Sequence, residues 1–303
     1  SDYAIEDSSA AILGDTGTVV DAAVSGVVVT DATGAGYVDA AAGADLSALE
    51  VQLDGVSNNT QSDIVFRVED SASAIAAELS SDNTLLDGAN DLEVAGGITD
   101  IDGGFDIQSS AGYDAANSDY AIEDSAGAIL ASGNYNVVVD SGVEQVFVTD
   151  TVSVADGVSL SDMEVALEAE RGAETADIAF DVAGSASDII NNASDLSGAS
   201  IVTVTDGPVI AADGVALNTL EVSLEGDDDA DVYTNVEFSV EDSAPAIAAE
   251  LDGLQGGSID ALDGAESLVV SGGDTTVQGA ADIQSLSGIY DASNSAYSIT
   301  DTA

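Results

Sequence analysis

Two short runs of aspartate in this 303-residue chain have the residue types and the spacing of a site for a hard metal ion. Carboxylate oxygens held on a tight loop are the ligands that Ca²⁺ prefers, at about 2.3–2.6 Å. The first run is EGDDDADVY and the second is TDIDGGFD. The candidate metal ligands are Asp227, Asp229, Asp231, Asp100, Asp102 and Asp106. Ca²⁺ is the bound ion that these residues predict.

The competing interpretation of both runs is an exposed acidic turn. An EF-hand loop would need glycine at its sixth position and glutamate at its twelfth. Counted from Asp227, those positions hold Val232 and Phe238. The first run is therefore not an EF-hand, and both interpretations stay open.

Catalytic chemistry has few residues to work with. The chain lacks histidine, cysteine and lysine, so carboxylate pairs are the remaining acid–base groups, as in glycoside hydrolysis. With 58 carboxylates, some pair lies at a suitable distance by chance. Substrate-binding aromatics are also scarce, with no tryptophan, eight tyrosines and five phenylalanines. We expect no enzyme, no catalytic residues and no organic cofactor.

The chain is strongly acidic. Arg67 and Arg171 are the two basic residues, and the formal net charge is −56. The folded state must carry strong self-repulsion at low salt, which salt screens as the Debye length falls from about 30 Å at 0.01 M to about 3 Å at 1 M. We therefore expect stabilisation by salt or divalent cations. The negative charge argues against nucleic acid and anionic membranes as partners, because both attract basic surfaces.

The composition nevertheless predicts a folded chain. Hydrophobic residues make up 45% of it, and the mean hydropathy is +0.21. Aromatics contribute 4%, so the core must be built from small aliphatic side chains. No run of about 18 apolar residues is present that would span a membrane, so we expect no membrane insertion.

An internal repeat dominates the sequence. The motif is aromatic, any residue, Ile or Val, any residue, Asp, Ser or Thr, a small residue, two further residues and Ile. Its five complete copies are YAIEDSSAAI at 3–12, FRVEDSASAI at 66–75, YAIEDSAGAI at 120–129, FDVAGSASDI at 180–189 and FSVEDSAPAI at 238–247. A sixth copy begins at Tyr297. Copy four has Ala183 and Gly184 in place of Glu-Asp, so its cap must come from Ser185.

The motif predicts a strand, a cap and a short helix. The aromatic and the Ile or Val lie two residues apart, on one face of a strand. Asp followed by Ser or Thr is a helix N-cap signal, and we expect the repeated aspartate to be a cap rather than a metal ligand. The segments IAAEL at 75–79 and 247–251 continue as helix, with Pro245 in a first turn where proline is tolerated.

The second halves of the repeats come in two kinds. Repeats one, three and four carry LSALEVQL at 46–53, LSDMEVAL at 160–167 and LNTLEVSL at 217–224, whose alternation predicts strands. They also carry β-rich runs ending in Thr-Asp, at 25–31, 144–150 and 200–206. Repeats two and five carry DLEVAGG at 91–97 and SLVVSGG at 267–273 instead.

These elements predict a repeat protein that is mainly β with short helices, folded as a right-handed parallel solenoid. The alternative is a string of small β-sandwich domains. The expected repeats are 1–63, 64–117, 118–177, 178–235 and 236–294, with 295–303 starting a sixth repeat completed elsewhere. An unfinished unit would leave an end on which the next segment or chain stacks.

The motif with its Val-Thr-Asp strand ends resembles the tandem repeats of giant bacterial extracellular and surface proteins, including RTX-type adhesins. YAIEDSAGAIL at 120–130 and YSITDTA at 297–303 carry the likeness, although the glycine-rich calcium nonapeptide of RTX modules is missing. The resemblance implies an extracellular or cell-surface structural protein of a filament, matrix or surface layer. Its expected partner is itself, as a head-to-tail homopolymer or a continued chain, together with divalent cations. The alternative is an adhesin region that binds glycans or other cells.

Overall fold

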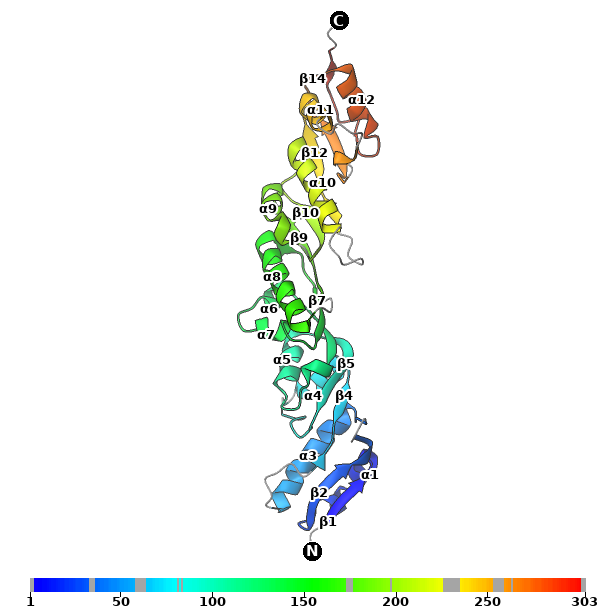
Figure 1. Cartoon of the computed structure of the whole chain (residues 1–303), viewed down its shortest axis with the longest axis vertical. Coiled ribbons are helices and arrows are strands. Elements are labelled where there is room, and N and C mark those ends of the chain that lie inside the picture. The colour runs from blue at the N-terminus through cyan, green and yellow to red at the C-terminus, as the bar shows by residue number, and fades with distance from the viewer. Residues whose placement is uncertain are drawn as a thin grey trace. The chain divides into compact units, whose positions relative to one another are not determined.

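The computed structural model describes residues 3–32, 36–57, 64–80, 82, 84–172, 177–196, 198–225, 235–252, 259–262 and 264–300. The chain divides into two compact units, each of two segments. Unit 1 comprises Ser1–Thr149 and Met163–Asp177, and unit 2 comprises Asp150–Asp162 and Ile178–Ala303. Within each unit, helices alternate with strands along the chain (Figure 1).

Unit 1 contains seven described strands. They are β1 (Tyr3–Asp7), β2 (Val24–Val29), β3 (Ile64–Val65), β4 (Val68–Asp70), β5 (Leu92–Thr99), β6 (Asp119–Asp124) and β7 (Val143–Val148). Its helices are α1 (Ser9–Gly14), α2 (Thr16–Val19), α3 (Ala40–Ser57), α4 (Ala72–Leu79), α5 (Ile101–Ser109), α6 (Ala126–Ile129) and α7 (Tyr135–Val138), with 3-10 turns η1 (Thr30–Ala32) and η2 (Ala115–Asn117). Helix α8 (Val154–Arg171) belongs in part to each unit.

Unit 2 follows the same alternation. Its strands are β8 (Val152–Ser153), β9 (Asp177–Gly184), β10 (Ala199–Val204), β11 (Asn235–Glu237), β12 (Ser239–Asp242), β13 (Ser267–Val270), β14 (Asp274–Thr275) and β15 (Ser298–Ile299). Its helices are α9 (Ala186–Asn191), α10 (Ala211–Glu225), α11 (Ala244–Asp252) and α12 (Val277–Ser285), with 3-10 turns η3 (Ala193–Asp195) and η4 (Ile259–Leu262).

The described strand pairs within each unit are parallel. In unit 1, β1, β2 and β3 pair in that order, as do β4, β5, β6 and β7. In unit 2, β9 lies between β8 and β10, which pairs with β11, and the pairs β12–β13 and β14–β15 are separate. Parallel neighbours need a crossover, and the intervening helices supply it.

The predicted fold class is wrong. The chain is a mixed α/β protein with parallel strands and helices between them, neither a mainly β right-handed parallel solenoid nor a string of β-sandwich domains. The prediction of a filament built from stacked solenoid coils fails with that architecture. The six expected repeats stay a prediction. One limit of the two compact units, between Asp177 and Ile178, coincides with the expected boundary between the third and fourth repeats.

The error lies in the segments 46–53, 160–167 and 217–224. They were expected as strands, but they lie within α3, α8 and α10. The buried residues of α3 are Leu46, Leu49 and Leu53, which recur at helical spacing, whereas Val51 is 72% exposed. The Val-x-Leu pattern that resembled a strand therefore lies on a helix, with Val51 on its solvent face and Leu53 on its buried face.

The strand–cap–helix reading of the motif is confirmed. The N-caps of α1, α4, α6 and α9 are Ser8, Ser71, Ser125 and Ser185, and each serine Oγ accepts the N–H three residues further on at 3.1–3.4 Å. The last isoleucine of every complete copy is at most 2% exposed: Ile12, Ile75, Ile129, Ile189 and Ile247. Pro245 lies in the first turn of α11, as expected.

The β-rich runs are also strands as expected. The three runs ending in Thr-Asp form β2, β7 and β10, and the alternative second halves form β5 and β13. Helices α4 and α5 lie beside one another next to β4 and β5 in Figure 1. The motif therefore supplies both the strand and the helix start of each α/β step.

Candidate functional site

The repeated aspartate joins two helix starts in three copies of the motif. One oxygen of its carboxylate accepts the N–H of the following serine, at 2.8 Å in Asp70 and 2.7 Å in both Asp124 and Asp242. The other oxygen accepts an N–H at the start of a helix that precedes it in sequence. These second bonds are Ala40 to Asp70 at 3.1 Å, Ile101 to Asp124 at 3.3 Å, and Ala211 to Asp242 at 3.1 Å.

The aspartates that end the Thr-Asp runs make a related contact. Asp31 accepts the Ser9 N–H and the Ser9 hydroxyl, both at 2.7 Å, at the start of α1. Asp206 accepts the Ala186 N–H at the start of α9, at 3.1 Å. Helix N-termini carry unsatisfied N–H groups and partial positive charge, so carboxylates are stabilising there.

These contacts correct the cap assignment for the motif. The serine is the N-cap, and the preceding aspartate bridges it to a second helix start. The motif carboxylates meet backbone N–H groups, and Ca²⁺ as a bound ion stays a prediction.

The second predicted metal run lies on α5. Asp100 is the N-cap of this helix and accepts the Gly103 N–H at 2.8 Å. Asp102 and Asp106 follow on the helix, and all three line a shallow hollow with Ser73 and Ser80 of the α4 region. Among the described residues, they do not belong to a carboxylate group whose oxygens come within 4.8 Å of one another.

The first predicted run, Asp227, Asp229 and Asp231, lies outside the described residues. Its role as a calcium site stays a prediction, as does Ca²⁺ as a bound ion. The run with Asp100, Asp102 and Asp106 therefore lies at the start of α5, whereas the run from Asp227 to Asp231 is not described.

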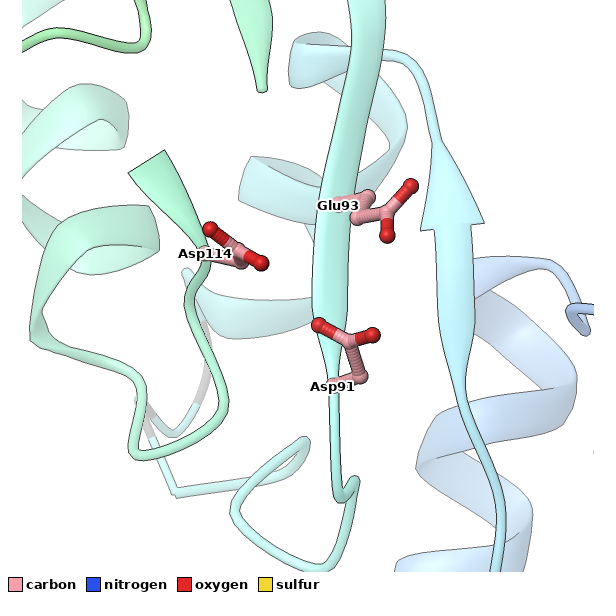
Figure 2. Close-up of side chains that lie close together, drawn as sticks. All are labelled: Asp91, Glu93 and Asp114. Carbon is pink, nitrogen blue, oxygen red and sulfur yellow. The ribbon is translucent and has the colours of Figure 1, made fainter. Parts of the chain in front are cut away.

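The described part of the chain gathers carboxylates at one place that the sequence reasoning missed. Asp91, Glu93 and Asp114 each offer an oxygen within 4.8 Å of the others, and all three are half-buried. Asp91 and Glu93 flank Leu92 at the start of β5, and Asp114 lies on the adjacent segment before η2 (Figure 2). Oxygens so placed could hold a hard cation.

An arginine already occupies this group. Arg67 Nη2 lies 2.5 Å from Asp91 Oδ2 and 3.1 Å from Glu93 Oε1, and Nε donates to Asp91 Oδ2 at 2.8 Å. Tyr37 donates its hydroxyl hydrogen to Glu93 and accepts from Arg67, whose Cζ lies 4.1 Å from the Tyr37 ring centroid. A metal ion would have to displace the guanidinium.

The local charges hold this network together. The hydrogen bond to Glu93 is the main reason that the pKa of Tyr37 rises to about 12. The bond to Asp91 raises the pKa of Arg67. Asp114 is engaged separately, since it accepts the Ala116 N–H at 3.0 Å and an Asn117 amide hydrogen at 2.9 Å. The cluster is thus an arginine-centred ion-pair network that links the residue before β4 to β5. Arg67 could have indicated it in the sequence, because a chain with two cations and 58 carboxylates is expected to place each cation beside carboxylates.

The second cation is also used internally. The Arg171 side chain is 8% exposed, and Nη1 donates to the carbonyls of Ser141 and Val143 at 3.1 and 3.0 Å. Nη2 lies 3.5 Å from Asp119 Oδ1. Arg171 therefore links the end of α8 to the start of β7. In the same way, Arg67 links the residue before β4 to β5.

The site holds no residue that the sequence predicted as a metal ligand, and no described helix is long and apolar enough to cross a membrane. Comparison with known proteins adds no relative. No protein-family model matches the chain, and no curated protein matches it. The functional argument therefore depends on the residues described above.

Proposed function

We propose that this chain is a structural repeat segment of an extracellular matrix or surface layer, and that its copies associate end to end in salt. We also propose that the chain is not an enzyme. The proposal keeps the location that the resemblance to giant surface proteins implies, and it does not depend on a solenoid.

The observation that supports it most is what the repeat keeps constant. The invariant motif positions supply a helix cap, a buried isoleucine and, in most copies, a bridging carboxylate. Each has a structural partner inside the fold. A repeated binding surface would keep exposed side chains the same from copy to copy, and the motif does so at the position before the aspartate, with Glu6, Glu69, Glu123 and Glu241. We propose that these exposed glutamates add to the acidic surface of the structural segment.

The use of charge agrees with a structural role. Both cations of the chain lie within intramolecular networks. The remaining surface is strongly acidic, so copies repel one another until salt shortens the Debye length to a few ångströms. Association is then expected in concentrated salt and not in dilute buffer.

The adhesin alternative has one observation in its favour. Phe105 on α5 and Tyr135 on α7 are 52% and 50% exposed, and these helices contact one another. Exposed aromatic rings provide apolar faces on which a sugar ring can pack. The double variant Phe105→Ala/Tyr135→Ala would abolish glycan binding if this alternative is correct.

Sedimentation velocity separates the two functions. The purified chain is studied over a concentration series in dilute buffer and in about 1 M NaCl, where screening is nearly complete. Concentration-dependent growth in salt supports the structural proposal. A monomer at every concentration, together with retention on a glycan array, would refute it.

A further inference from the structure

Helix α3 carries a stripe of three oxygen-bearing side chains. Ser47, Glu50 and Asp54 recur at i, i+3 and i+7, so they lie along one face of the helix. Ser47 is 7% exposed and Glu50 is 8% exposed. Among the described residues, Ser47 Oγ and Asp54 Oδ1 are shielded from solvent and have no hydrogen-bond partner. A buried polar atom left in this way costs about 1–3 kcal/mol, so the stripe calls for a bound group.

The stripe faces Gly88, which lies in the loop between α4 and β5. A Cβ added to Gly88 would lie 2.7 Å from Glu50 Oε2 and 2.9 Å from Ser47 Oγ. The two oxygens therefore converge beside this loop. The glycine leaves them the room that a larger side chain would take.

The corresponding place beside α10 is filled by a longer side chain. Asn218 holds the position of Ser47 in its repeat, and the run LDGA that contains Gly88 recurs around Gly264. Asn218 Oδ1 accepts the Gly264 N–H at 2.9 Å, so this copy joins helix to loop directly. The shorter Ser47 makes no such bond. In the α3 copy a further group is needed between the helix and the loop.

We propose that Ser47, Glu50 and Asp54 bind a hard divalent cation between α3 and the Gly88 loop. Hydroxyl and carboxylate oxygens are the ligands that such ions take, and two carboxylates balance the charge of one ion. The ion joins helix to loop as Asn218 does in α10. The site is distinct from the arginine-centred network and from both predicted aspartate runs, and it does not rest on the proposed association.

Ser47→Ala tests the site through the sign of its effect on stability. In EDTA the variant should be at least as stable as the wild type, because a buried hydroxyl without a partner is removed. With about 10 mM MgCl₂ or CaCl₂ the wild type should become the more stable, since an ion that binds the folded state alone stabilises it. The urea midpoint in about 1 M NaCl, where general repulsion is screened, reports both differences. A difference that is the same in EDTA and in either cation would overturn the proposal.

Ser47→Asn places the α10 residue in α3. Its amide should accept the Gly88 N–H, so the urea midpoint should respond less to MgCl₂ or CaCl₂ than that of the wild type. Ser187→Ala, at an exposed position of α9, is the control and should keep the wild-type response.

Binding is measured directly with Mn²⁺ by electron paramagnetic resonance in the same NaCl solution. Ser47→Asn and Ser47→Ala should each weaken the tightest Mn²⁺ binding by about tenfold or more. Equal Mn²⁺ binding by the wild type and both variants would refute the site. Sedimentation in NaCl with EDTA tests the proposed association separately, so the failure of one does not imply the failure of the other.

Discussion

Asp70 Oδ2 accepts a hydrogen bond from the backbone N–H of Ala40 at 3.1 Å, across 30 residues of sequence. The other oxygen of the same carboxylate accepts the N–H of Ser71 at 2.8 Å. One side chain therefore holds the start of α3 next to the start of α4. The repeated acidity of the motif is in this respect structural, because each bridging carboxylate neutralises backbone donors of two helices.

The remaining carboxylates should make folding depend on salt. Raising NaCl from about 0.01 M to about 1 M shortens the Debye length tenfold, so the repulsion among a net charge of −56 is screened. We expect the melting temperature to rise by several degrees, and KCl to act as NaCl does. Differential scanning calorimetry measures this. An unchanged melting temperature would show that the charges are already compensated in dilute buffer.

Arg67 should be needed to hold Asp91 and Glu93 together. Arg67→Ala leaves two half-buried carboxylates facing one another, and we expect a loss of about 1–3 kcal/mol in the free energy of unfolding at low salt. Arg67→Lys should lose less, because it keeps the charge while losing the forked geometry. Urea titration measures both losses. Equal losses in the two variants would show that the charge does not matter there.

The same variant tests whether these carboxylates can collect a divalent cation. In Arg67→Ala, CaCl₂ should restore more stability than NaCl at equal ionic strength, since the guanidinium no longer occupies the oxygens. The wild-type protein is the control, and the difference between the two salts should be smaller there. If the variant shows no such difference, Asp91, Glu93 and Asp114 are not a cation site even when vacant.

Two glycines should respond to alanine in opposite directions. A Cβ at Gly103 would lie 2.1 Å from Thr99 Oγ1 and 2.9 Å from the Ala76 Cβ, where α4 and α5 pack closely. We expect Gly103→Ala to cost about 1–3 kcal/mol. Gly127 on α6 has no atom within 4 Å of such a Cβ, so Gly127→Ala should stabilise by about 0.4–1 kcal/mol. Urea unfolding of the pair checks this, and a shared sign would contradict the packing argument.

The free energy of unfolding should depend on pH through the lowered pKa of Asp31. Burial alone would raise its pKa, but the hydrogen bonds from the Ser9 hydroxyl and N–H outweigh it and lower the pKa below the ordinary 3.8. A lowered folded-state pKa means stabilisation that is complete above about pH 4 and is lost as the pH falls through the folded value. The difference in unfolding free energy between wild type and Asp31→Asn should therefore shrink below pH 3.8. Asp162→Asn is the control, at an exposed position of α8. A constant difference across this range would contradict the assignment.

The motif was predictable because its signals are local. A strand followed by a cap and an alanine-rich segment uses dihedral preferences within ten residues, so the element order was predicted. Ser185 caps as expected, whereas Ser71 and Ser125 cap in place of the aspartates that precede them. The segments at 46–53 and 160–167 were mispredicted because each combines apolar residues at i, i+3 and i+7 with a short Val-x-Leu alternation. The residue at i+3 is Leu49 in the first and Met163 in the second. Periods of 2 and 3.6 are hard to distinguish over eight residues.

The arginine-centred site was not predictable from spacing. Tyr37, Arg67, Asp91 and Asp114 are far apart in sequence, and parallel pairing of β4 with β5 brings Arg67 beside Asp91. The second hydrogen bond of each bridging aspartate could not be predicted for the same reason. Ala40 and Asp70 are 30 residues apart in sequence, and the fold brings them together. Local patterns identify elements, whereas these contacts follow from the order of strands.

The bridging role of the motif aspartate is tested most directly by comparing Asp70→Ala with Asp7→Ala. Asp7 makes the first bond, to the Ser8 N–H at 2.8 Å, and the described structure gives it no second helix start. Each variant removes one charge and one local bond. In urea unfolding at about 1 M NaCl, where repulsion is screened, we expect Asp70→Ala to lose about 1–2 kcal/mol more than Asp7→Ala. Equal losses would contradict the claim that the repeated carboxylate holds two helices together.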